Sequence, residues 1–433
     1  MSVKKQQKLW LFAAGIILTA LTLRGAVTVV PPLISTINED LPLSAATIGI
    51  LGMLPTAAFG LFGFLTPYVI RLASLEKLIV AAILLGIIGQ LVRVMVPTTP
   101  LFLVFSVVAF GGLGAGNVLL PPLVKKHFPT KIGLMTAVYV TAISIGTALP
   151  AQLAVPVADA TNWQFSLSSW VALSTVALIP WFVALFSPKT VAGSAGVDTV
   201  AGEPAGGVRG ETGATTSADA LIIHSSAVAT APPPKMNLWR SPTAWGLTFM
   251  FGCTSLNTYA LFAWLPEILT EAGLDRAHAG SMLALFGALG LPLSLGIPLI
   301  AAKLRNPFPA VVVMLGCFVA GYLGLLLSPA DGTWLWVSLT GLGPGTFPLA
   351  LLLINHRTRT QVGAGALSGF GQGMGYTLAC TGPLFFGLLR QWTGSWTAPF
   401  MFLFATLLLL GAGAWVICRP RMLEDDFAPR LAS

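Results

Sequence analysis

The sequence predicts an all-α membrane protein with twelve transmembrane helices. Of its 433 residues, 55% are hydrophobic and only 9% are charged, whereas roughly a quarter of the residues are charged in an ordinary soluble domain. The apolar residues also fall in blocks of about twenty, the length an α-helix needs to cross a bilayer. Twelve such blocks follow one another along the chain. Because so few charges cannot cover a water-exposed surface, we expect the lipid bilayer to surround most of it.

The twelve blocks define the predicted spans. They cover residues 10–31, 47–70, 77–96, 100–123, 132–157, 167–187, 243–266, 279–301, 308–328, 334–355, 362–389 and 396–418. The first block follows three lysines, as the apolar part of a signal peptide would. It contains Arg24, however, and it runs into Pro31 and Pro32 without an A-x-A cleavage pattern. We therefore expect it to be retained as the first helix.

The basic residues predict the orientation. Lys and Arg near the ends of spans are retained on the cytoplasmic side. With the N-terminus inside, 19 of the 23 basic residues fall on the inner side. Arg93, Arg276 and Arg390 fall in outer segments, which leaves Arg24 within a span. We expect a bacterial inner-membrane protein, a monomer, with both termini in the cytoplasm.

One long hydrophilic stretch divides the chain. Residues 188–241 are rich in Gly, Ala, Thr, Ser and Pro. Too few of them are bulky and apolar to bury a core, so the composition indicates a flexible cytoplasmic linker. It separates a predicted N-terminal six-helix bundle, 1–187, from a C-terminal one, 242–418, and a cytoplasmic tail follows at 419–433.

The two halves repeat one another. The matching stretches are Gly112 to Gly116 with Gly341 to Gly345, Pro31 with Pro266, and Pro150 with Pro383, at shifts of 229, 235 and 233 residues. Three matches at nearly one shift, in the same order, indicate a duplicated six-helix unit. The sequence therefore predicts two pseudo-symmetric six-helix bundles with a cavity on the axis between them.

Several stretches carry a resemblance to a known family. They are LRGAVTVVPPL (Leu23 to Leu33), LPPLVKKHFP (Leu120 to Pro129), AWLPEIL (Ala263 to Leu269), GLGPG (Gly341 to Gly345) and LSGFGQGMGYTLACTGPLFFG (Leu367 to Gly387). With the twelve spans and the central linker, they resemble the major facilitator superfamily, specifically its cyanate permease and nitroimidazole transporter branch. The resemblance implies the major facilitator fold and transport of a small anion such as cyanate. Nitroimidazole-like or other small planar compounds, exported in some cases, are the alternative that it implies.

Arg24 is the first candidate for substrate binding. It lies fourteen residues after Trp10, which corresponds to about 21 Å of helix. A charged group at that depth costs at least about 2.5 kcal/mol, and no Asp or Glu occurs at a similar depth in the predicted spans. The planar guanidinium fork matches a small planar anion. We expect Arg24 to bind the substrate anion; the alternative is a structural arginine bonded to backbone carbonyls.

The repeat extends the candidate site. Tyr259 precedes Pro266 by seven residues, as Arg24 precedes Pro31, so we expect it to face the cavity from the other half. The shift of 233 pairs Gln372 with Tyr139, and Tyr376 lies one helical turn beyond Gln372. Each of these polar residues has an alternative role, a hydrogen bond to a neighbouring helix.

Three further residues complete the predicted site. Asn117 and Asn257 are polar residues inside spans four and seven. Trp264, like Trp163, is first interpreted as an aromatic residue of the membrane interface, but it also has the position to close the cavity from outside.

Glu267, at the outer end of span seven, is the acid that we expect to be able to link transport to protons. An exposed acid at the end of a helix is the ordinary alternative interpretation.

Other classes of function are disfavoured. An intramembrane enzyme needs clustered His, Asp, Glu or Cys, and a sensor needs a folded soluble domain; the sequence offers neither. The four cysteines indicate small core residues, without a metal site or disulfide framework. The basic residues form no stripe typical of nucleic-acid binding, and no Walker loop for ATP is present. We expect a secondary transporter, not an enzyme, that needs no cofactor and whose partners are its small-molecule substrate and lipid.

Overall fold

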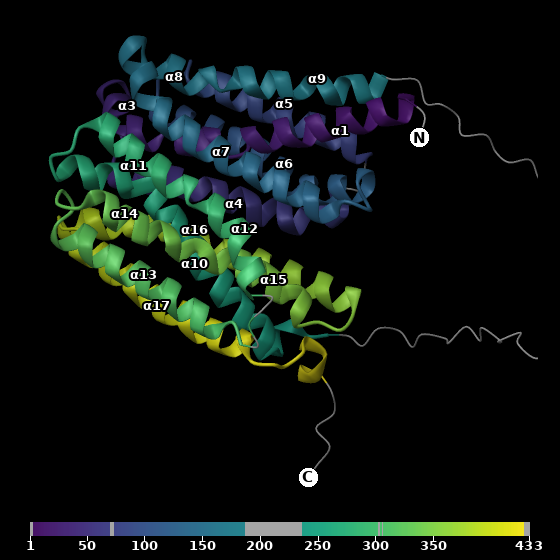
Figure 1. Cartoon of the computed structure of the whole chain (residues 1–433). Coiled ribbons are helices and arrows are strands. Elements are labelled where there is room, and N and C mark those ends of the chain that lie inside the picture. Colours follow the sequence, from purple (N-terminus) through teal and green to yellow (C-terminus); the bar gives the residue numbers. More distant parts are fainter. Residues whose placement is uncertain (1–2, 70–72, 187–235, 302–303, 305, 428–433) are drawn as a thin grey trace, which may run out of the picture. The chain divides into compact units, whose positions relative to one another are not determined.

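Helices make up nearly all of the part of the chain that the computed structural model describes, residues 3–69, 73–186, 236–301, 304 and 306–427. Most of the predicted linker, 188–235, lies outside the described residues. The described residues up to Phe186 and from Asn237 onward pack as one compact unit, and its helices run roughly along one direction (Figure 1).

The helices follow the twelve predicted spans. In the first half they are α1 Val3–Thr22, α2 Gly25–Thr28, η1 Pro31–Leu33, α3 Ile34–Asp40, α4 Ala45–Val69, α5 Leu75–Arg93, α6 Thr99–His127, α7 Ile132–Ala160, α8 Trp163–Ser169 and α9 Val171–Phe186. In the second half they are η2 Leu238–Arg240, α10 Pro242–Glu271, α11 Arg276–Ala288, α12 Gly290–Ala301, α13 Phe308–Leu327, α14 Thr333–Leu342, η3 Gly343–Gly345, α15 Thr346–His356, α16 Gln361–Thr393, α17 Thr397–Cys418 and η4 Leu423–Asp426.

Ten helices of the described chain are long and apolar enough to cross a membrane. In this count, consecutive helices separated by a short break are taken as one, for example over Leu9–Asp40 and Thr333–His356. The two predicted spans that are not among them are α10, with 30 residues, and α16, with 33. Both helices are long enough to span, but they carry more Ser, Thr, Gly, Asn and Gln than their neighbours. Helices of this kind are expected where side chains face protein or a cavity and not lipid.

The first span is broken at Arg24, although the sequence predicts one helix over residues 10–31. Helix α1 ends at Thr22, Arg24 precedes α2, and the chain then continues through η1 and α3. The two consecutive prolines at the start of η1 lack N–H donors and cannot continue an α-helical ladder. The prolines thereby remove the donors to the carbonyl oxygens of Val27 and Thr28, so they end α2 and do not cause the break before it. The carbonyl oxygen of Arg24 accepts the N–H groups of Val27 and Thr28, and α2 begins there. The break sets the Arg24 side chain at the middle of the span.

The unit has two ends. We call the end where α1 begins and α17 ends the terminal face, and the end that carries α3 and α8 the opposite face (right and left, respectively, in Figure 1). Helix α5 runs from the terminal face to the opposite face, because α4 begins near α3 and ends near the start of α5.

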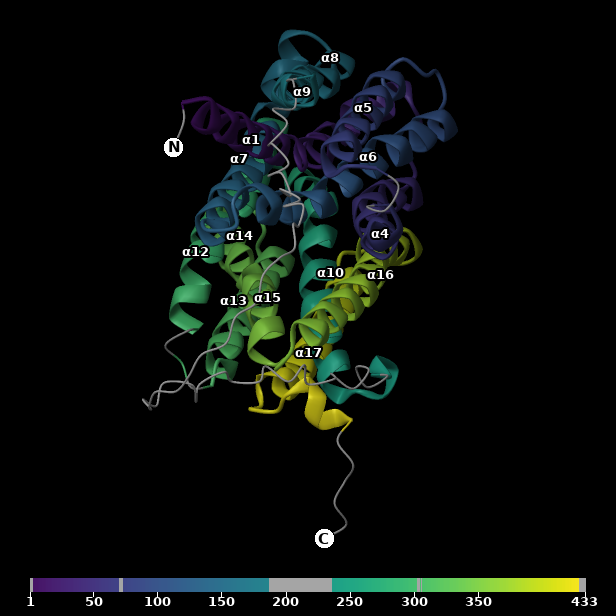
Figure 2. The same ribbon diagram turned by 90° about the vertical axis from the view of Figure 1, so that its right-hand side faces the viewer.

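The two halves meet along two seams. Helix α4 packs along α16, and α7 packs along α11 (Figure 2). At Gly52 of α4, an added Cβ would lie 2.7 Å from the Cβ of Ala263 on α10 and 2.8 Å from that of Pro383 on α16. Only glycine permits this approach, as in close helix contacts generally.

A short segment after α17 binds the terminal face of the second half. The Glu424 carboxylate accepts the backbone N–H groups of Arg359 and Thr360 before α16. The Asp426 carboxylate accepts the Ser241 hydroxyl and the Thr243 N–H at the start of α10. Carboxylates in these positions cap the free N–H groups of a helix start. Helices α10 and α16 are thus held by one four-residue element.

Three residues lie elsewhere than the sequence predicts. Trp163 and Trp264 do not present their rings to lipid as an aromatic belt would, because their side chains are buried and their indole N–H groups donate to Asp40 and to the Pro383 carbonyl oxygen. Arg93 is not in an outer loop: it is the last residue of α5 and is fully buried.

Candidate substrate site

A cavity of about 150 Å³ lies between the two halves. It is lined from the first half by Arg24, Ile143, Ser144 and Thr147, and from the second half by Ser255, Thr258, Tyr259, Phe262, Gly287, Gly290, Leu293, Ser294, Pro344, Phe347, Pro348 and Tyr376. We call it the central cavity. Its wall is mostly apolar and aromatic, with a few hydroxyl groups, the usual composition of a small-molecule site.

Arg24 brings the positive charge of this cavity. The Arg24 side chain is partly buried at the break in the first span. Its Cζ atom lies 5.0 Å from the ring centre of Phe59 and 5.2 Å from that of Tyr259. Among the described residues, no carboxylate forms an ion pair with Arg24. Aromatic faces attract the cation but do not neutralise it.

Two aromatic rings contact the guanidinium, and a third ring packs against one of them. Phe59 comes from α4, Tyr259 from α10 and Tyr376 from α16. Phe59 packs edge-to-face against both tyrosines, with ring centres 6.3 Å from Tyr259 and 5.7 Å from Tyr376. Each ring fixes the next, so the position of Arg24 depends on both halves of the protein.

Two hydroxyl groups of the cavity have no partner among the described residues. The Oη of Tyr259 and the Oγ of Ser255 are closed off from solvent and form no hydrogen bond. Buried polar groups without a partner are unusual in folded proteins. Other hydroxyls of the cavity are satisfied: Ser144 and Thr147 donate to backbone carbonyls one turn earlier in α7. The free hydroxyls and the guanidinium together form a polar side in an otherwise apolar cavity.

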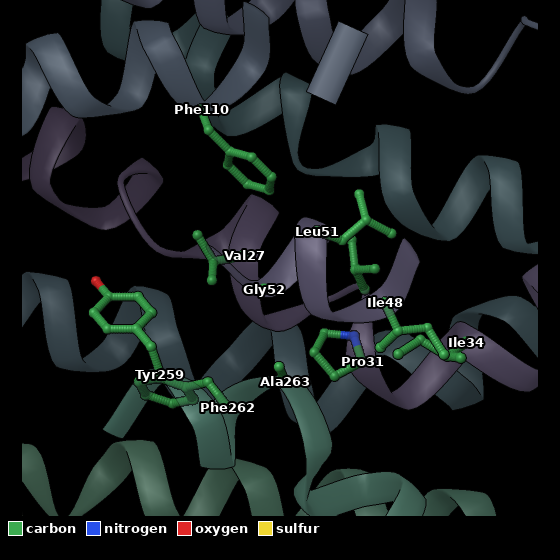
Figure 3. Close-up of a pocket in the computed structure, with 11 residues that line it drawn as sticks. Val27, Pro31, Ile34, Ile48, Leu51, Gly52, Phe110, Tyr259, Phe262 and Ala263 are labelled. Carbon is green, nitrogen blue, oxygen red and sulfur yellow. The ribbon is translucent and has the colours of Figure 1, made fainter. Parts of the chain in front are cut away.

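Two more cavities continue from the central one toward the opposite face. A space of about 20 Å³, the apolar constriction, shares Tyr259 and Phe262 with the central cavity. A space of about 230 Å³, the vestibule, shares Pro31, Ile34 and Ile48 with the constriction. Figure 3 shows the side chains of the constriction, with Phe110 entering from the side away from Tyr259. The three cavities therefore form a series between the first span and α10.

Glu267 lies in the vestibule. It is two helical turns beyond Tyr259 on α10, and its Oε2 atom is closed off from solvent without a hydrogen-bond partner. Glu271, one turn further, pairs with Arg390 at 2.8 Å. The unpaired acid therefore faces the vestibule beside a carboxylate that is already neutralised.

The structure brings together some of the predicted residues. Arg24, Tyr259 and Tyr376 line the central cavity. Tyr139 packs against the apolar core of the first half, and the Gln372 amide donates to Ser368 one turn away at 2.7 Å. Neither is among the residues lining the cavity, so their substrate contact stays a prediction.

The two predicted asparagines are also outside the cavity lining. Asn117 is partly buried in α6. Asn257 is fully buried; its amide donates to the Cys253 carbonyl oxygen and to Thr406, and it accepts the Tyr322 hydroxyl at 2.8 Å. The Asn257 amide thus links α10, α13 and α17 through its hydrogen bonds. This is the role in helix packing that the sequence analysis gave as the alternative to substrate binding.

Sequence reasoning missed Phe59 and Ser255. Phe59 is one of several phenylalanines in an apolar helix, and no repeat match points to it. Ser255 precedes Tyr259 by four residues on α10, so helical spacing from Tyr259 is the signal that places it on the same face.

Comparison with known proteins identifies the family. The sequence model of the Major Facilitator Superfamily matches residues 16–380. The chain is 32% identical to an uncharacterized transporter, YycB, of Bacillus subtilis (94% of this chain, 93% of the relative) and 32% identical to the 2-nitroimidazole transporter of Escherichia coli (90% of each). It is 26% identical to the cyanate transport protein CynX of Escherichia coli, over 89% of this chain and 92% of that protein.

A solved structure agrees with the fold. The crystal structure of a bacterial homologue of the human lysosomal transporter Spinster, in an inward-facing and occupied conformation, superposes with a TM-score of 0.69. The match covers 99% of this chain and 100% of that one at 14% identity. At this identity the likeness shows a shared fold and no more. The chain therefore belongs to the Major Facilitator Superfamily and is a multi-pass membrane transporter of small molecules, not an enzyme.

Proposed function

We propose that this protein is a secondary transporter that carries a small planar anion, with cyanate as the simplest case, across the bacterial inner membrane. The observation that carries the proposal is the guanidinium of Arg24, which lies at the central cavity without a carboxylate partner among the described residues. An unpaired charge within a membrane protein is a functional site by default. A bound anion would supply the missing negative charge.

The neighbours of Arg24 define how the anion would bind. Phe59 and Tyr259 approach its guanidinium with their rings, and such stacking leaves the N–H groups at the edge of the guanidinium available. A carboxylate or nitro group meets that edge with two coplanar oxygen atoms, and linear cyanate meets it with one terminal acceptor atom. The unpartnered hydroxyl groups of Tyr259 and Ser255 would donate to the same ligand.

A planar ring compound is the second candidate. The volume of about 150 Å³ is similar to that of an engineered cavity that holds benzene, roughly 150 Å³. The rings of Phe262, Phe347 and Tyr376 line it, which favours an aromatic ligand over a three-atom anion. The relatives that transport cyanate and 2-nitroimidazole are compatible with either candidate. For a nitroimidazole, Arg24 would bind the nitro oxygens, and the direction of transport would be export.

We also propose the orientation and the moving parts. The distribution of Lys and Arg supports a cytoplasmic terminal face. Residues 1–187 and 242–418 would form the two bundles that rock about the central cavity as a monomer, with 188–241 as the cytoplasmic linker and 419–433 as the tail. The seams of α4 with α16 and of α7 with α11 are the surfaces on which they would move.

Binding to purified protein tests the proposal. We expect cyanate, 2-nitroimidazole or both to raise the melting temperature of the wild-type protein. Arg24→Gln should abolish the shift, and Arg24→Lys, which keeps the charge but loses the planar fork, should retain a smaller one. Arg419→Gln, at an exposed arginine directly after α17, is the control. Equal shifts in wild-type protein and Arg24→Gln would exclude Arg24 as the ligand.

Proton symport through Glu267 is part of the proposal. The charged groups that face Glu267 in the described structure are Glu271 on its own helix and Arg390 from α16. The first span lines the vestibule with uncharged residues, among them Ser35 and Asn38. In proteoliposomes, an inward proton gradient should drive accumulation of substrate by wild-type protein and by Glu271→Gln, but not by Glu267→Gln. Gradient-driven accumulation by Glu267→Gln would refute this role.

A further inference from the structure

A second arginine, Arg93, is buried in the first half with no partner among the described residues. Its side chain is fully buried at the end of α5, and Nε, Nη1 and Nη2 are all closed off from solvent without a hydrogen bond. Its one recorded interaction is with a ring: Cζ lies 5.8 Å from the ring centre of Phe110 on α6. A buried charge without hydrogen bonds is strongly unfavourable. A bound anion would supply the hydrogen-bond acceptors that the Arg93 guanidinium lacks.

A second unsatisfied group lies at the matching level of the neighbouring helix. Helices α5 and α6 are antiparallel and close-packed, because an added Cβ at Gly89 would lie 2.3 Å from the backbone nitrogen of Ala109. One turn further toward the opposite face, Arg93 on α5 stands at the level of Ser106 on α6. Ser106 is fully buried and its Oγ has no hydrogen-bond partner. A cation and a hydroxyl donor therefore lie unsatisfied on the same seam.

Phe110 connects this pair to the transport route. The ring that covers Arg93 also lines the apolar constriction (Figure 3). Tyr259 lines the constriction on its other side and contacts Arg24. The two unpaired arginines are thus each in contact with a ring of the same constriction, Arg93 on the side of the opposite face and Arg24 on the side of the central cavity.

We propose that Arg93 and Ser106 form a second anion-binding station on the α5–α6 seam, directly behind the Phe110 ring that lines the constriction; in the closed state neither residue lines the constriction or the vestibule. The anion bound there is of the class that Arg24 binds, a small planar monoanion, so the inference rests on the proposed function. While the constriction is closed, the Phe110 ring covers the guanidinium. When the halves separate at the opposite face, the constriction that Phe110 lines widens, the ring can turn away from Arg93, and the guanidinium becomes reachable.

Anion uptake measured separately from the two sides tests the station. The probes are radiolabelled cyanate and 2-nitroimidazole, both assayed in mildly acidic buffer, where the ring N–H of 2-nitroimidazole stays protonated and the compound is a neutral planar control. In right-side-out vesicles, Arg93→Gln should raise the half-saturating concentration of cyanate by roughly tenfold or more, the loss expected for a charge-assisted hydrogen bond. In inside-out vesicles the same variant should stay within about twofold of wild type, because cyanate reaches Arg24 first from that side.

Matched variants keep the test decisive. Arg93→Lys should recover part of the affinity, and Arg419→Gln, at an exposed arginine of the terminal face that packs on Trp415, should behave as wild type. If Arg93→Gln does not insert, Ser106→Ala carries the test, with a smaller increase on the same side only. An equal effect from both sides, an equal effect on 2-nitroimidazole, or no effect would overturn the station.

The two proposals fail in distinguishable ways. Suppose that Arg24→Gln loses cyanate uptake from both sides and that Arg93→Gln has the same effect from both sides. The central anion site is then supported and the second station is refuted. If wild-type protein transports cyanate from neither side, the central anion site has failed, and the station falls with it.

Discussion

The guanidinium of Arg24, in the first half of the chain, lies 5.2 Å from the ring centre of Tyr259 in the second half. The contact joins the two sequence positions that the internal repeat pairs, each seven residues before a proline. It also crosses the interface that must rearrange in a rocking transporter. We therefore expect ligand binding and movement of the halves to be coupled through this pair.

The Tyr259 ring should matter more than its hydroxyl for the position of Arg24. Tyr259→Leu removes a cation–π contact of about 0.5–2 kcal/mol, so ligand affinity should fall by roughly 2- to 30-fold. Tyr259→Phe keeps the ring and should lose only the hydroxyl contribution. Isothermal titration with cyanate or 2-nitroimidazole measures both variants; a larger loss in Tyr259→Phe than in Tyr259→Leu would contradict the expected order.

Asn257 should act in stability and not in substrate affinity. Asn257→Ala removes three buried hydrogen bonds, each worth roughly 0.6 kcal/mol in a membrane protein. It leaves the Tyr322 hydroxyl without its partner, whereas the Thr406 hydroxyl still donates to the Leu403 carbonyl oxygen. We expect a total loss of about 1–3 kcal/mol in unfolding free energy. Thr406→Ala removes only part of the network and should cost less. The half-saturating substrate concentration should stay at the wild-type value in both variants.

Gly52 should control closure toward the opposite face. In Gly52→Val the new side chain collides with Ala263 and Pro383, so α4 cannot approach α10 and α16. We expect ligand binding to remain while transport is lost. A cysteine at Ile48, in a background without the four native cysteines, should then react faster with an impermeant maleimide added outside. Gly296→Val is the control, because an added Cβ at Gly296 meets no atom within 4 Å.

The segment Leu423–Asp426 should make stability sensitive to acid. Burial alone would raise the pKa of Glu424, but hydrogen bonds from its own backbone and from Arg359 and Thr360 outweigh burial and hold the pKa below its usual value. Its stabilising contribution is therefore complete above the ordinary glutamate pKa of about 4.3. It is lost as the pH falls through the lowered value.

Melting curves between neutral pH and pH below about 4 measure this contribution. Glu424→Gln should lower the melting temperature at neutral pH and should lose less than wild type on acidification. A variant that melts at the wild-type temperature at neutral pH would show that the cap of α16 does not contribute.

The sequence predicted the spans well because membrane helices need long apolar blocks and little else. The repeat also predicted that Arg24 and Tyr259 lie at one cavity, since duplicated units place equivalent residues at equivalent positions. The break at Arg24 was not predicted, because Pro31 lies seven residues further along and a proline removes only the hydrogen bond to the carbonyl four residues before it.

Other differences have the same local origin. The indole N–H of Trp264 on α10 donates to the Pro383 carbonyl oxygen on α16, and this bond exists only because the two helices pack together. Arg93 lies near the outer end of the predicted span 77–96, and nothing in that pattern shows whether its side chain leaves the span or is buried. Positions that depend on the contact of two distant helices are therefore the ones that sequence patterns miss.

The narrow apolar constriction has a consequence for selectivity. A space of about 20 Å³ holds little more than one water molecule, for which roughly 10–15 Å³ suffices. Even after it widens, its wall offers Val27, Leu51 and Ala263 but few polar groups to replace a hydration shell. A solute that crosses must shed its water, so weakly hydrated anions such as thiocyanate should pass more readily than strongly hydrated ones such as sulfate.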